Sequence, residues 1–355
     1  MRAPRSSRPI FFTIMEQHQR PVARVEHLWR YAVKGLDRDE LSAVELGEKN
    51  CTLPSDRRYA LKYADSDPFD PCAPAWLHKK NFLCAFTAGP ALGAYTTAYD
   101  DATDELTVKA RDTGALVMRA RLTCPAGIAH VEEFFSSVTR RDVRLVEGSG
   151  GAARPHHFGN TPCGYKKGSG DPRVLHILNS ATVAAVEAAA RAAGHNAQLH
   201  AARFRPNIVL TGLPAWEEFA WVGRRVQIGG AKFRVLSRTV RCEATNSDPW
   251  HPGGPEAASS GSSSSSPSPS PVWAAGKGVP ELIQRLFPEH GPYLGVYAQV
   301  VGAGTVEVGD GVVVPLDVVD ASVAACRGAC VVIFAALCVA CRFKRSNASG
   351  GCGSE

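Results

Sequence analysis

The sequence lacks an excess of charge in its central part. Its 355 residues carry 40 lysines and arginines against 34 acidic residues, which gives a net charge of +6. Residues 1–24 supply +4, from five arginines against one glutamate, and residues 342–355 supply +2, from three cations against one glutamate. The stretch 25–341 is therefore neutral. Because a nucleic-acid-binding protein needs a basic face on its folded part, we expect no nucleic-acid partner.

The sequence also has little sign of cysteine pairing. Of its 11 cysteines, five fall in the last thirty residues and the other six are scattered. Scattered cysteines are typical of a reduced, intracellular protein, cytoplasmic or mitochondrial, and not of a disulfide framework. The single CxxC motif, Cys338 to Cys341, lies in an apolar run without a histidine nearby. Since structural zinc needs four ligands, we expect no zinc site there.

Several catalytic signatures are missing as well. The sequence contains no GxSxG nucleophile elbow. Glycine-rich stretches such as GAGTVEVGDG lack the strand, GxGxxG and helix context of a dinucleotide site. No haem, flavin or iron–sulfur motif is visible either. Any redox activity of this chain would therefore depend on separate electron-carrier proteins.

What is present is the composition of a globular protein, with 45% hydrophobic and 21% charged residues. Two helices are expected, at 128–138 and at 180–194, where Ser180 would cap the start and Gly194 the end. Alternating apolar and polar residues predict many short strands, and the combination indicates a mainly β fold with a few helices, built from β-barrels. The expected strands are 22–33, 43–47, 58–64, 93–99, 105–110, 115–121, 174–178, 207–212, 224–230, 231–242, 294–301 and 306–314, with the last two joined by the turn GAG.

The patterning suggests two domains. We expect an N-terminal β-barrel module over 22–145 and a second β-barrel domain over 153–316. The Ser/Pro-rich stretch 251–278 cannot bury enough apolar surface to fold, so it is expected to be a disordered insertion in the second domain.

Each end of the chain is open to two interpretations. Residues 1–21 are rich in arginine and serine, with no acidic residue before Glu16, which fits a mitochondrial transit segment or a basic tail. Residues 323–341 are apolar and Cys-rich with one charge, Arg327, and the basic sequence RFKR follows. This fits a membrane anchor, which needs about 20 apolar residues, or a buried C-terminal helix.

One cysteine stands out by its neighbours. Cys242 ends the expected strand 231–242, which also carries Lys232, Arg234, Arg238 and the adjacent Arg241. Nearby cations favour the thiolate, and thiolate selects soft metals. Arginine matches phosphate oxygens bidentately. The pattern suits a metal whose organic carrier bears a phosphate, although solvated arginines beside a packing cysteine would give the same sequence.

A longer pattern surrounds this cysteine. The runs FRPNIVLTG (204–212), WVGRRVQIGGAKFRVLSRTVRCEAT (221–245) and LGVYAQVV (294–301) resemble the MOSC domain, the C-terminal domain of molybdenum cofactor sulfurases. The same domain occurs in the mitochondrial amidoxime-reducing component. Upstream, VEHLWRYAVKG (25–35) and SDRRYAL (55–61) resemble the β-barrel module that precedes MOSC in those proteins.

The resemblance implies a site for the molybdenum cofactor, molybdopterin, and a role for each matching residue. Cys242 of the RC motif would be the molybdenum ligand, and Asp171 of SGDPR would tune or relay a proton. The cofactor-binding residues implied are Lys34, Arg57, Arg205, Asn207 and Arg241.

The resemblance implies two activities of different classes. One is reduction of small N-hydroxylated substrates by an oxidoreductase that receives electrons from cytochrome b5-type donor proteins. The alternative is a sulfur carrier or cofactor-binding partner of a pyridoxal-phosphate-dependent sulfurase, without reductase activity. Three departures from the family pattern bear on either activity: Gly35 replaces the usual serine after VK, Ser247 replaces an apolar residue, and the insertion follows DP.

Overall fold

The computed structural model describes residues 23–48, 52–70, 77–148, 158, 174–195, 199–246 and 278–315. Several sequence predictions lie outside these residues: the 1–21 segment, Asp171, Ser247, the insertion up to residue 277, and the apolar 323–341 segment. No helix within the described residues is long and apolar enough to cross a membrane.

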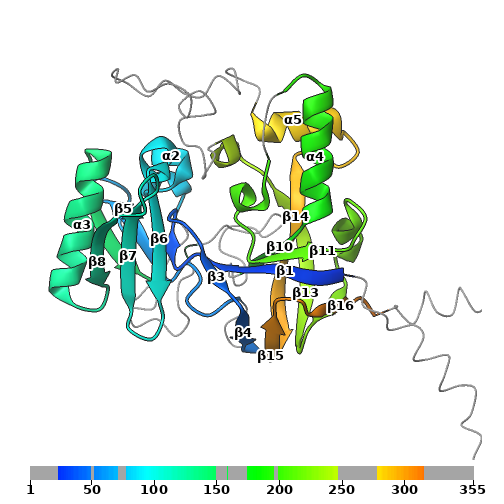
Figure 1. Ribbon diagram of the computed structural model, residues 1–355, viewed down its shortest axis with the longest axis horizontal. Helices are drawn as coiled ribbons and strands as arrows, with labels where there is room; N and C mark the ends of the chain where they lie inside the picture. The colour runs from blue at the N-terminus through cyan, green and yellow to red at the C-terminus, as the bar shows by residue number, and fades with distance from the viewer. Residues whose placement is uncertain are drawn as a thin grey trace, which may run out of the picture. The chain divides into compact units, whose positions relative to one another are not determined.

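The largest sheet closes into a barrel. Seven strands follow one another in the order β11-β10-β14-β13-β12-β16-β1, and β1 pairs back with β11 to complete the circle. β3 adds to the edge of β1 (Figure 1). The bounds are β1 Ala23–Arg30, β3 Asp39–Leu41, β10 Leu175–Asn179, β11 Ile208–Thr211, β12 Arg225–Ile228, β13 Ala231–Val240, β14 Tyr293–Gly302 and β16 Gly311–Val313.

Side-chain alternation explains the barrel. In β13, Ala231, Phe233 and Val235 are buried, whereas Lys232 and Arg234 between them are exposed. A strand with this period of two presents one face to a core and the other to water. The predicted mainly β fold with a barrel and few helices is therefore confirmed. The strand expected to open the N-terminal module, β1, is hydrogen-bonded into the barrel through β11 and β16.

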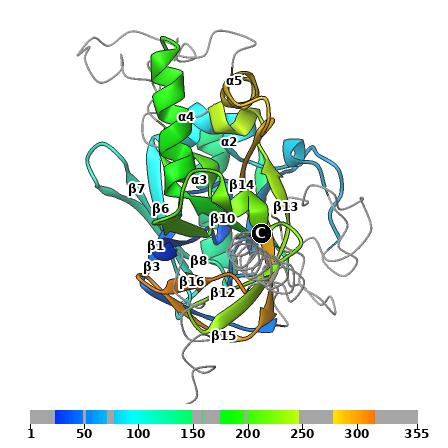
Figure 2. The ribbon, with the colours of Figure 1, turned by 90° about the vertical axis from the view of Figure 1, so that its right-hand side faces the viewer.

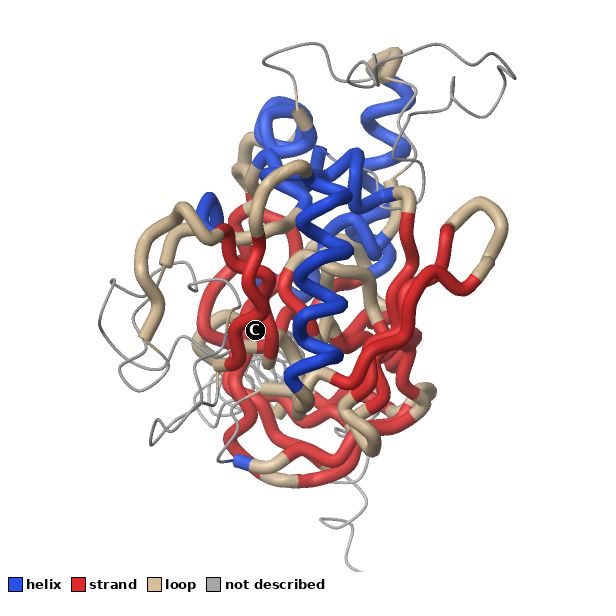
Figure 3. The backbone as a smooth tube through the Cα atoms, turned by 90° about the vertical axis from the view of Figure 1, so that its left-hand side faces the viewer, coloured by secondary structure: helices blue, strands red, loops and turns tan. Residues whose placement is uncertain are grey.

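Between β1 and β10 the chain forms two three-stranded sheets, ordered β2-β5-β9 and β6-β7-β8. Helix α3 packs on them around a core that includes Val131, Phe135 and Tyr63 (Figure 3). A separate pair, β4 with β15, joins this part of the chain to the barrel sequence. The bounds are β2 Val33–Lys34, β4 Ala43–Leu46, β5 Tyr59–Tyr63, β6 Tyr95–Asp100, β7 Glu105–Ala110, β8 Leu116–Arg121, β9 Val143–Glu147, β15 Gly304–Glu307, α2 Ala85–Gly93 and α3 Pro125–Thr139.

The remaining helices lie against the barrel (Figure 2). They are α4 Ser180–Ala192 and α5 Val279–Leu286, with the short 3-10 helices η3 Ala201–Phe204, η4 Glu217–Trp221 and η5 Glu243–Asn246, whereas η2 Lys79–Asn81 contacts α2. The prediction of Ser180 as N-cap is wrong by one residue. Asn179 caps α4, because its side chain accepts a hydrogen bond from the Ala181 backbone N–H.

The predicted hairpin at GAG does not form. β14 ends at Gly302 and β15 begins at Gly304, but β15 pairs with β4, and the expected strand 306–314 is divided between β15 and β16. The chain passes so close to Gly230 here that a Cβ on Gly304 would lie 2.2 Å from the Gly230 carbonyl oxygen. The glycines of this turn therefore allow the chain to pass close to Gly230 on its way from β14 to the pairing of β15 with β4, and they do not form a tight hairpin.

Candidate functional site

A cavity opens where the end of β13 faces the chain segments around β2 and α2. Its lining includes Cys242 with its neighbour Arg241, and Lys34 with its neighbour Gly35. The other lining residues are Leu36, Asp37, Arg57, Lys79, Cys84, Ala85, Phe86, Gly89, Leu92, Gly93, Tyr95, Thr97, Arg111, Phe135, Ala202, Arg203, Phe204, Arg205, Ala244 and Thr245. The cavity is apolar on the α2 side and strongly cationic beside the thiol.

Cys242 stands two residues beyond β13, at the start of η5. Its thiol is free, and the residue is exposed within the cavity lining. The Cys242 carbonyl accepts hydrogen bonds from the Thr245 backbone N–H at 2.9 Å and from the Thr245 hydroxyl at 2.8 Å. One residue earlier, the Arg241 backbone N–H donates to the Pro292 carbonyl at 2.8 Å. The backbone on both sides of the thiol is thus fixed, while the sulfur itself faces open space.

Arg205 comes from the C-terminal end of η3, where its backbone is left-handed with φ 54°. Its Nη1 donates to the Leu36 carbonyl at 2.7 Å, whereas its Nη2 is buried and has no hydrogen-bond partner among the described residues. Burial lowers the pKa of the guanidinium from its ordinary value. An arginine that braces one carbonyl and leaves a second donor unmet can bind an anion in the cavity.

Arg241 repeats this arrangement. Its Nη2 donates to the Phe204 carbonyl at 2.9 Å, and its Nε is buried without a partner in the described part of the chain. Burial again lowers the pKa of the guanidinium. Buried N–H donors are costly when left without an acceptor, so two such arginines on one wall favour a ligand that carries negative oxygens.

Lys34 reaches the cavity from β2. Its Nζ donates to the Phe158 carbonyl at 2.8 Å and lies 5.4 Å from the centre of the Phe82 ring. Burial is the main cause that lowers the pKa of this ammonium to about 8, and the charges of Arg57 and Arg205 act in the same direction. Lys34 can therefore gain or lose a proton close to neutral pH.

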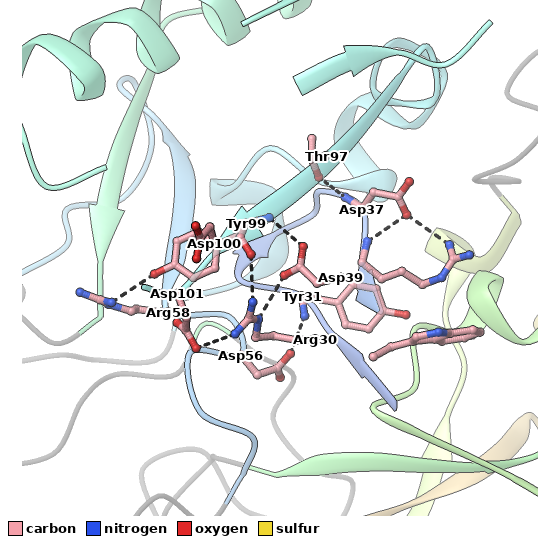
Figure 4. Close-up of polar contacts among 12 residues, drawn as sticks. Arg30, Tyr31, Asp37, Asp39, Asp56, Arg58, Thr97, Tyr99, Asp100 and Asp101 are labelled. Atoms are coloured by element: carbon pink, nitrogen blue, oxygen red, sulfur yellow. Dashed lines mark hydrogen bonds and ion pairs between the residues drawn. The ribbon is translucent and has the colours of Figure 1, made fainter. Parts of the chain in front are cut away.

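Arg57 is more firmly held than the other arginines. It forms an ion pair with Asp56, whose side chain is fully buried, and its Nη2 donates weakly to the Arg205 carbonyl at 3.4 Å. Asp56 also accepts from the Tyr31 backbone N–H at 2.8 Å (Figure 4). The predicted contact of Arg57 with a phosphate stays a prediction, since much of the guanidinium already has protein partners.

Tyr31 does not line the cavity, but it supports two arginines that do, and the sequence analysis did not single it out. The ring is 1% exposed, with the Arg205 guanidinium carbon 4.0 Å and the Arg57 guanidinium carbon 5.0 Å from its centre. The hydroxyl is buried and has no hydrogen-bond partner among the described residues. Burial raises the pKa of the phenol, so it stays protonated and able to donate. The signal available in the sequence was its position three residues before Lys34.

A second thiol in the cavity lining was also missed. Cys84 precedes α2, and its backbone N–H donates to the Thr87 hydroxyl at 3.0 Å, which helps to cap this helix. The charges of both Cys84 and Cys242 act on the pKa of Lys34. Nothing around Cys84 in the sequence distinguished it from the other scattered cysteines.

The structure does not bring Asn207 into the cavity. Its Nδ2 donates to the Trp29 carbonyl at 3.1 Å, and its Oδ1 accepts from the His176 backbone N–H at 3.1 Å. The residue is 1% exposed and links β1, β10 and the start of β11. In this structure Asn207 braces the barrel, and its predicted cofactor contact gains no support.

The one carboxylate among the lining residues is already neutralised. Asp37 accepts from Arg111 at 3.0 Å and from Arg38. Its backbone N–H donates to the Thr97 hydroxyl at 3.0 Å (Figure 4). The described lining therefore offers a surplus of cations. Among the described residues no group of three or more histidine, cysteine or acidic side chains could hold a metal ion. The soft potential metal ligands in the described lining are the thiols of Cys84 and Cys242.

The backbone conformation explains why glycine occupies position 35. Its φ is +88°, and a Cβ at this position would lie 2.3 Å from the Leu83 carbonyl oxygen. Only glycine adopts this conformation without strain. The departure from the family's serine thus follows from the close approach of the backbone before α2.

Barrel and cavity together define a class of protein: a β-barrel domain beside a cavity lined by two thiols, Cys84 and Cys242, and by several cations, of which Arg205 and Arg241 keep a buried N–H without an acceptor among the described residues. Residues 153–313 match the family model of the MOSC domain. This part of the chain is a MOSC domain, and MOSC domains are associated in general with binding of the molybdenum cofactor.

Two solved structures are similar to the chain at low identity. YiiM from Geobacillus stearothermophilus is 18% identical with a TM-score of 0.25, and the alignment covers 40% of this chain and 54% of that one. The chain thus spans about half the length of YiiM. The YuaD protein from Bacillus subtilis is 9% identical with a TM-score of 0.35, over 83% of this chain and 96% of that one. No curated protein matches the sequence.

Proposed function

We propose that the chain binds the molybdenum cofactor in this cavity and reduces N-hydroxylated small molecules. The proposal rests on one observation: the barrel wall combines an accessible thiol with guanidinium donors that lack acceptors in the described part of the chain. An exposed cysteine, Cys242, lines the cavity together with two half-buried arginines, Arg205 and Arg241, each with a buried N–H that has no acceptor among the described residues. Thiolate suits a soft metal, and unmet guanidinium donors suit a phosphate.

The residues present fit the group. Cys242 would supply the thiolate ligand, and the unmet donors of Arg205 and Arg241, with the ammonium of Lys34, would hold the anionic end. When bound, the cofactor supplies two-electron chemistry at its metal. Phe86 and Leu92 of α2 make one side of the cavity lining apolar, which would suit an apolar part of a small substrate. Lys34, with its pKa near 8, holds or releases a proton beside both thiols.

The proposal includes two partners. Electrons would come from a cytochrome b5-type protein, because the sequence carries no haem, flavin or iron–sulfur motif of its own. The substrate would be a small molecule with an N–O bond, and Asp171 is proposed to relay the proton that its reduction requires. Asp171 lies outside the described residues.

The test is to purify the full chain with the cofactor supplied and to measure molybdenum per protein and benzamidoxime reduction with a cytochrome b5 electron system. We expect metal and turnover in the native chain, and loss of both in Cys242→Ser. The matched control is Cys124→Ser, since Cys124 is a free thiol that caps α3, away from the cavity lining. It should keep metal and turnover.

Two other outcomes of these measurements would lead to different conclusions. Metal without turnover, together with a persulfide on Cys242, would favour the sulfur carrier that serves a pyridoxal-phosphate-dependent sulfurase. Unchanged metal content in Cys242→Ser would contradict the assignment of this thiol as ligand.

A further inference from the structure

Two thiols line the cavity, one just beyond the end of β13 and the other just before the start of α2. The described part of the chain contains three cysteines, and all three thiols are free. Cys242 and Cys84 belong to the cavity lining, whereas Cys124 does not. The proposed function uses Cys242 and gives no role to Cys84. A second thiol in the same cavity as an exposed one is typical of cysteine pairs that react with each other.

The segments that carry the two thiols are neighbours in space. Cys242 immediately precedes η5 and Cys84 immediately precedes α2, and Cα atoms of η5 lie within 8 Å of Cα atoms of α2. A disulfide joins cysteines whose Cα atoms are about 4.4–6.8 Å apart. Besides burial, which is the main cause, the charges of both thiols act on the pKa of Lys34. The two thiols therefore face one cavity from adjacent segments, near the same ammonium group.

The start of α2 is weakly tied to the rest of the helix. The backbone N–H groups of Thr87 and Ala88 both donate to the Cys84 carbonyl at 2.9 Å and form the first turn. The helical conformation is then interrupted at Ala88, where φ is −153° and ψ is 33°. Pro90 has no backbone N–H with which to bond the Phe86 carbonyl. A break of this kind can absorb the dihedral changes that let Cys84 approach η5.

The two thiols differ in their access to solvent. Cys242 is exposed, whereas Cys84 is half-buried. The Cys84 thiol donates to the Lys79 carbonyl at 3.8 Å and accepts from the Thr87 hydroxyl at 3.8 Å. An exposed sulfur meets an oxidant first, and a neighbouring thiol that is held in place is suited to react with the oxidised sulfur. The order of reaction that follows is Cys242 first and Cys84 second.

We propose that Cys84 and Cys242 form a reversible disulfide when a peroxide enters the cavity of the chain without cofactor. The Cys242 sulfur attacks one oxygen of the peroxide, the O–O bond breaks, and a sulfenic acid and one water form. The Cys84 sulfur then attacks the sulfenic sulfur, the S–O bond breaks, and the departing hydroxide takes the Cys84 proton as a second water. The two sulfurs together lose two electrons, which the peroxide gains. A dithiol reductant restores both thiols by thiol–disulfide exchange.

The disulfide makes the cavity sensitive to oxidation. It protects Cys242 from the irreversible sulfinic acid, because the sulfenic acid is consumed before it meets a second peroxide. It also removes the thiolate that a soft metal requires, so the oxidised chain should not take up molybdenum. This last consequence rests on the proposed function, whereas the disulfide itself does not.

The experiment treats the full-length chain, without cofactor, with hydrogen peroxide, blocks the remaining thiols with N-ethylmaleimide and maps the tryptic peptides by mass spectrometry. The native chain should yield a peptide pair joined through Cys84 and Cys242, which dithiothreitol separates. Cys84→Ser should lose this pair completely, and its Cys242 should proceed to the sulfinic acid. Cys84→Ala provides a second variant with the same expected result, and thermal unfolding verifies that both are folded.

The matched control is Cys124→Ser, because Cys124 is a half-buried free thiol at the N-cap of α3, as Cys84 is at the N-cap of α2. It should keep the joined peptide pair. The proposal is overturned if the native chain yields no such pair at a peroxide concentration that oxidises Cys242 in Cys84→Ser. It is also overturned if Cys242 pairs with any other cysteine of the chain.

Molybdenum uptake by the oxidised chain, and by the same chain after dithiothreitol, tests the consequence separately. We expect uptake to be lost on oxidation and restored on reduction. If the disulfide forms but uptake is unchanged, the assignment of Cys242 as metal ligand is wrong and the disulfide stands. The failure of the proposed function and the failure of the disulfide are thus distinguished by different measurements.

Discussion

The two walls of the cavity differ in whether their arginines have ion-pair partners. On the barrel wall, Arg205 and Arg241 form no ion pair with described residues, and each keeps a buried N–H without an acceptor. On the opposite wall, Arg57 is paired with buried Asp56, and Arg111 is paired with Asp37. Charges that are already neutralised hold a wall in place, whereas unmet charges are available to a ligand. The barrel wall, which carries the unmet guanidinium donors, is therefore the binding wall, and the other wall, apart from Lys34, is its support.

Of the substitutions in the two walls, Arg57→Gln should lower the free energy of unfolding most. This change leaves the carboxylate of Asp56 buried and without its ion-pair partner, which costs about 3–5 kcal/mol of unfolding free energy. Arg205→Gln should cost clearly less, because it removes a carbonyl brace and no ion-pair partner. Denaturant unfolding of both variants without cofactor measures the difference. Equal losses would show that the two walls do not differ in this way.

Gly35→Ser tests how rigid the backbone of the supporting wall is at Gly35. It restores the residue usual in the family but should destabilise this chain by about 2–4 kcal/mol, since φ is +88° and the new Cβ meets the Leu83 carbonyl. Gly47→Ser is the control, because a Cβ there meets nothing within 4 Å. Thermal unfolding compares the two. A stable Gly35→Ser protein would mean that the backbone before α2 moves easily.

Ligand affinity should reverse the order of the arginines. Arg205→Gln removes an unmet buried donor, so binding of the cofactor should weaken by about 10- to 100-fold, as expected for a charge-assisted hydrogen bond. Arg57→Gln, measured under conditions where it is folded, should weaken binding less. Molybdenum retained after dialysis is one readout, and the affinity for inorganic phosphate is another that does not depend on the metal.

Lys34 makes the supporting wall sensitive to pH. Its folded pKa of about 8 lies below its ordinary value, so the unfolded chain binds more protons above pH 8. The free energy of unfolding without ligand should therefore rise as pH increases from about 8 toward 10. Anion binding should fall over the same range, because the ammonium loses its charge. Lys34→Gln should remove both slopes, and equal slopes in the variant would assign them to other groups.

Much of this site could be predicted from the sequence. The remaining features could not, because they depend on contacts between residues that are far apart in the chain. Cys242 and Arg241 were found because a strand end with a cysteine and clustered cations is a local pattern. The bracing contacts of Asn207 could not be read from the sequence because its partners, Trp29 and His176, are 178 and 31 residues away in the chain. The strand pairing of β15 with β4 could not be read either, since it depends on a glycine crossing and not on a turn signal.

Tyr31 offers the smallest and most specific test of the comparison, because its ring lies between Arg205 of the binding wall and Arg57 of the support. Tyr31→Phe keeps the ring and removes only the hydroxyl, which has no partner among the described residues. Without ligand the variant should be as stable as the native chain or more stable by about 1 kcal/mol, since an unmet buried group is gone. Tyr31 is not among the lining residues of the cavity, so a several-fold loss of molybdenum retention would show that the wall rearranges on binding and brings the hydroxyl to the cofactor. A variant that is less stable but binds normally would show that the hydroxyl serves the fold, and the binding wall would then consist of arginines and the thiol alone.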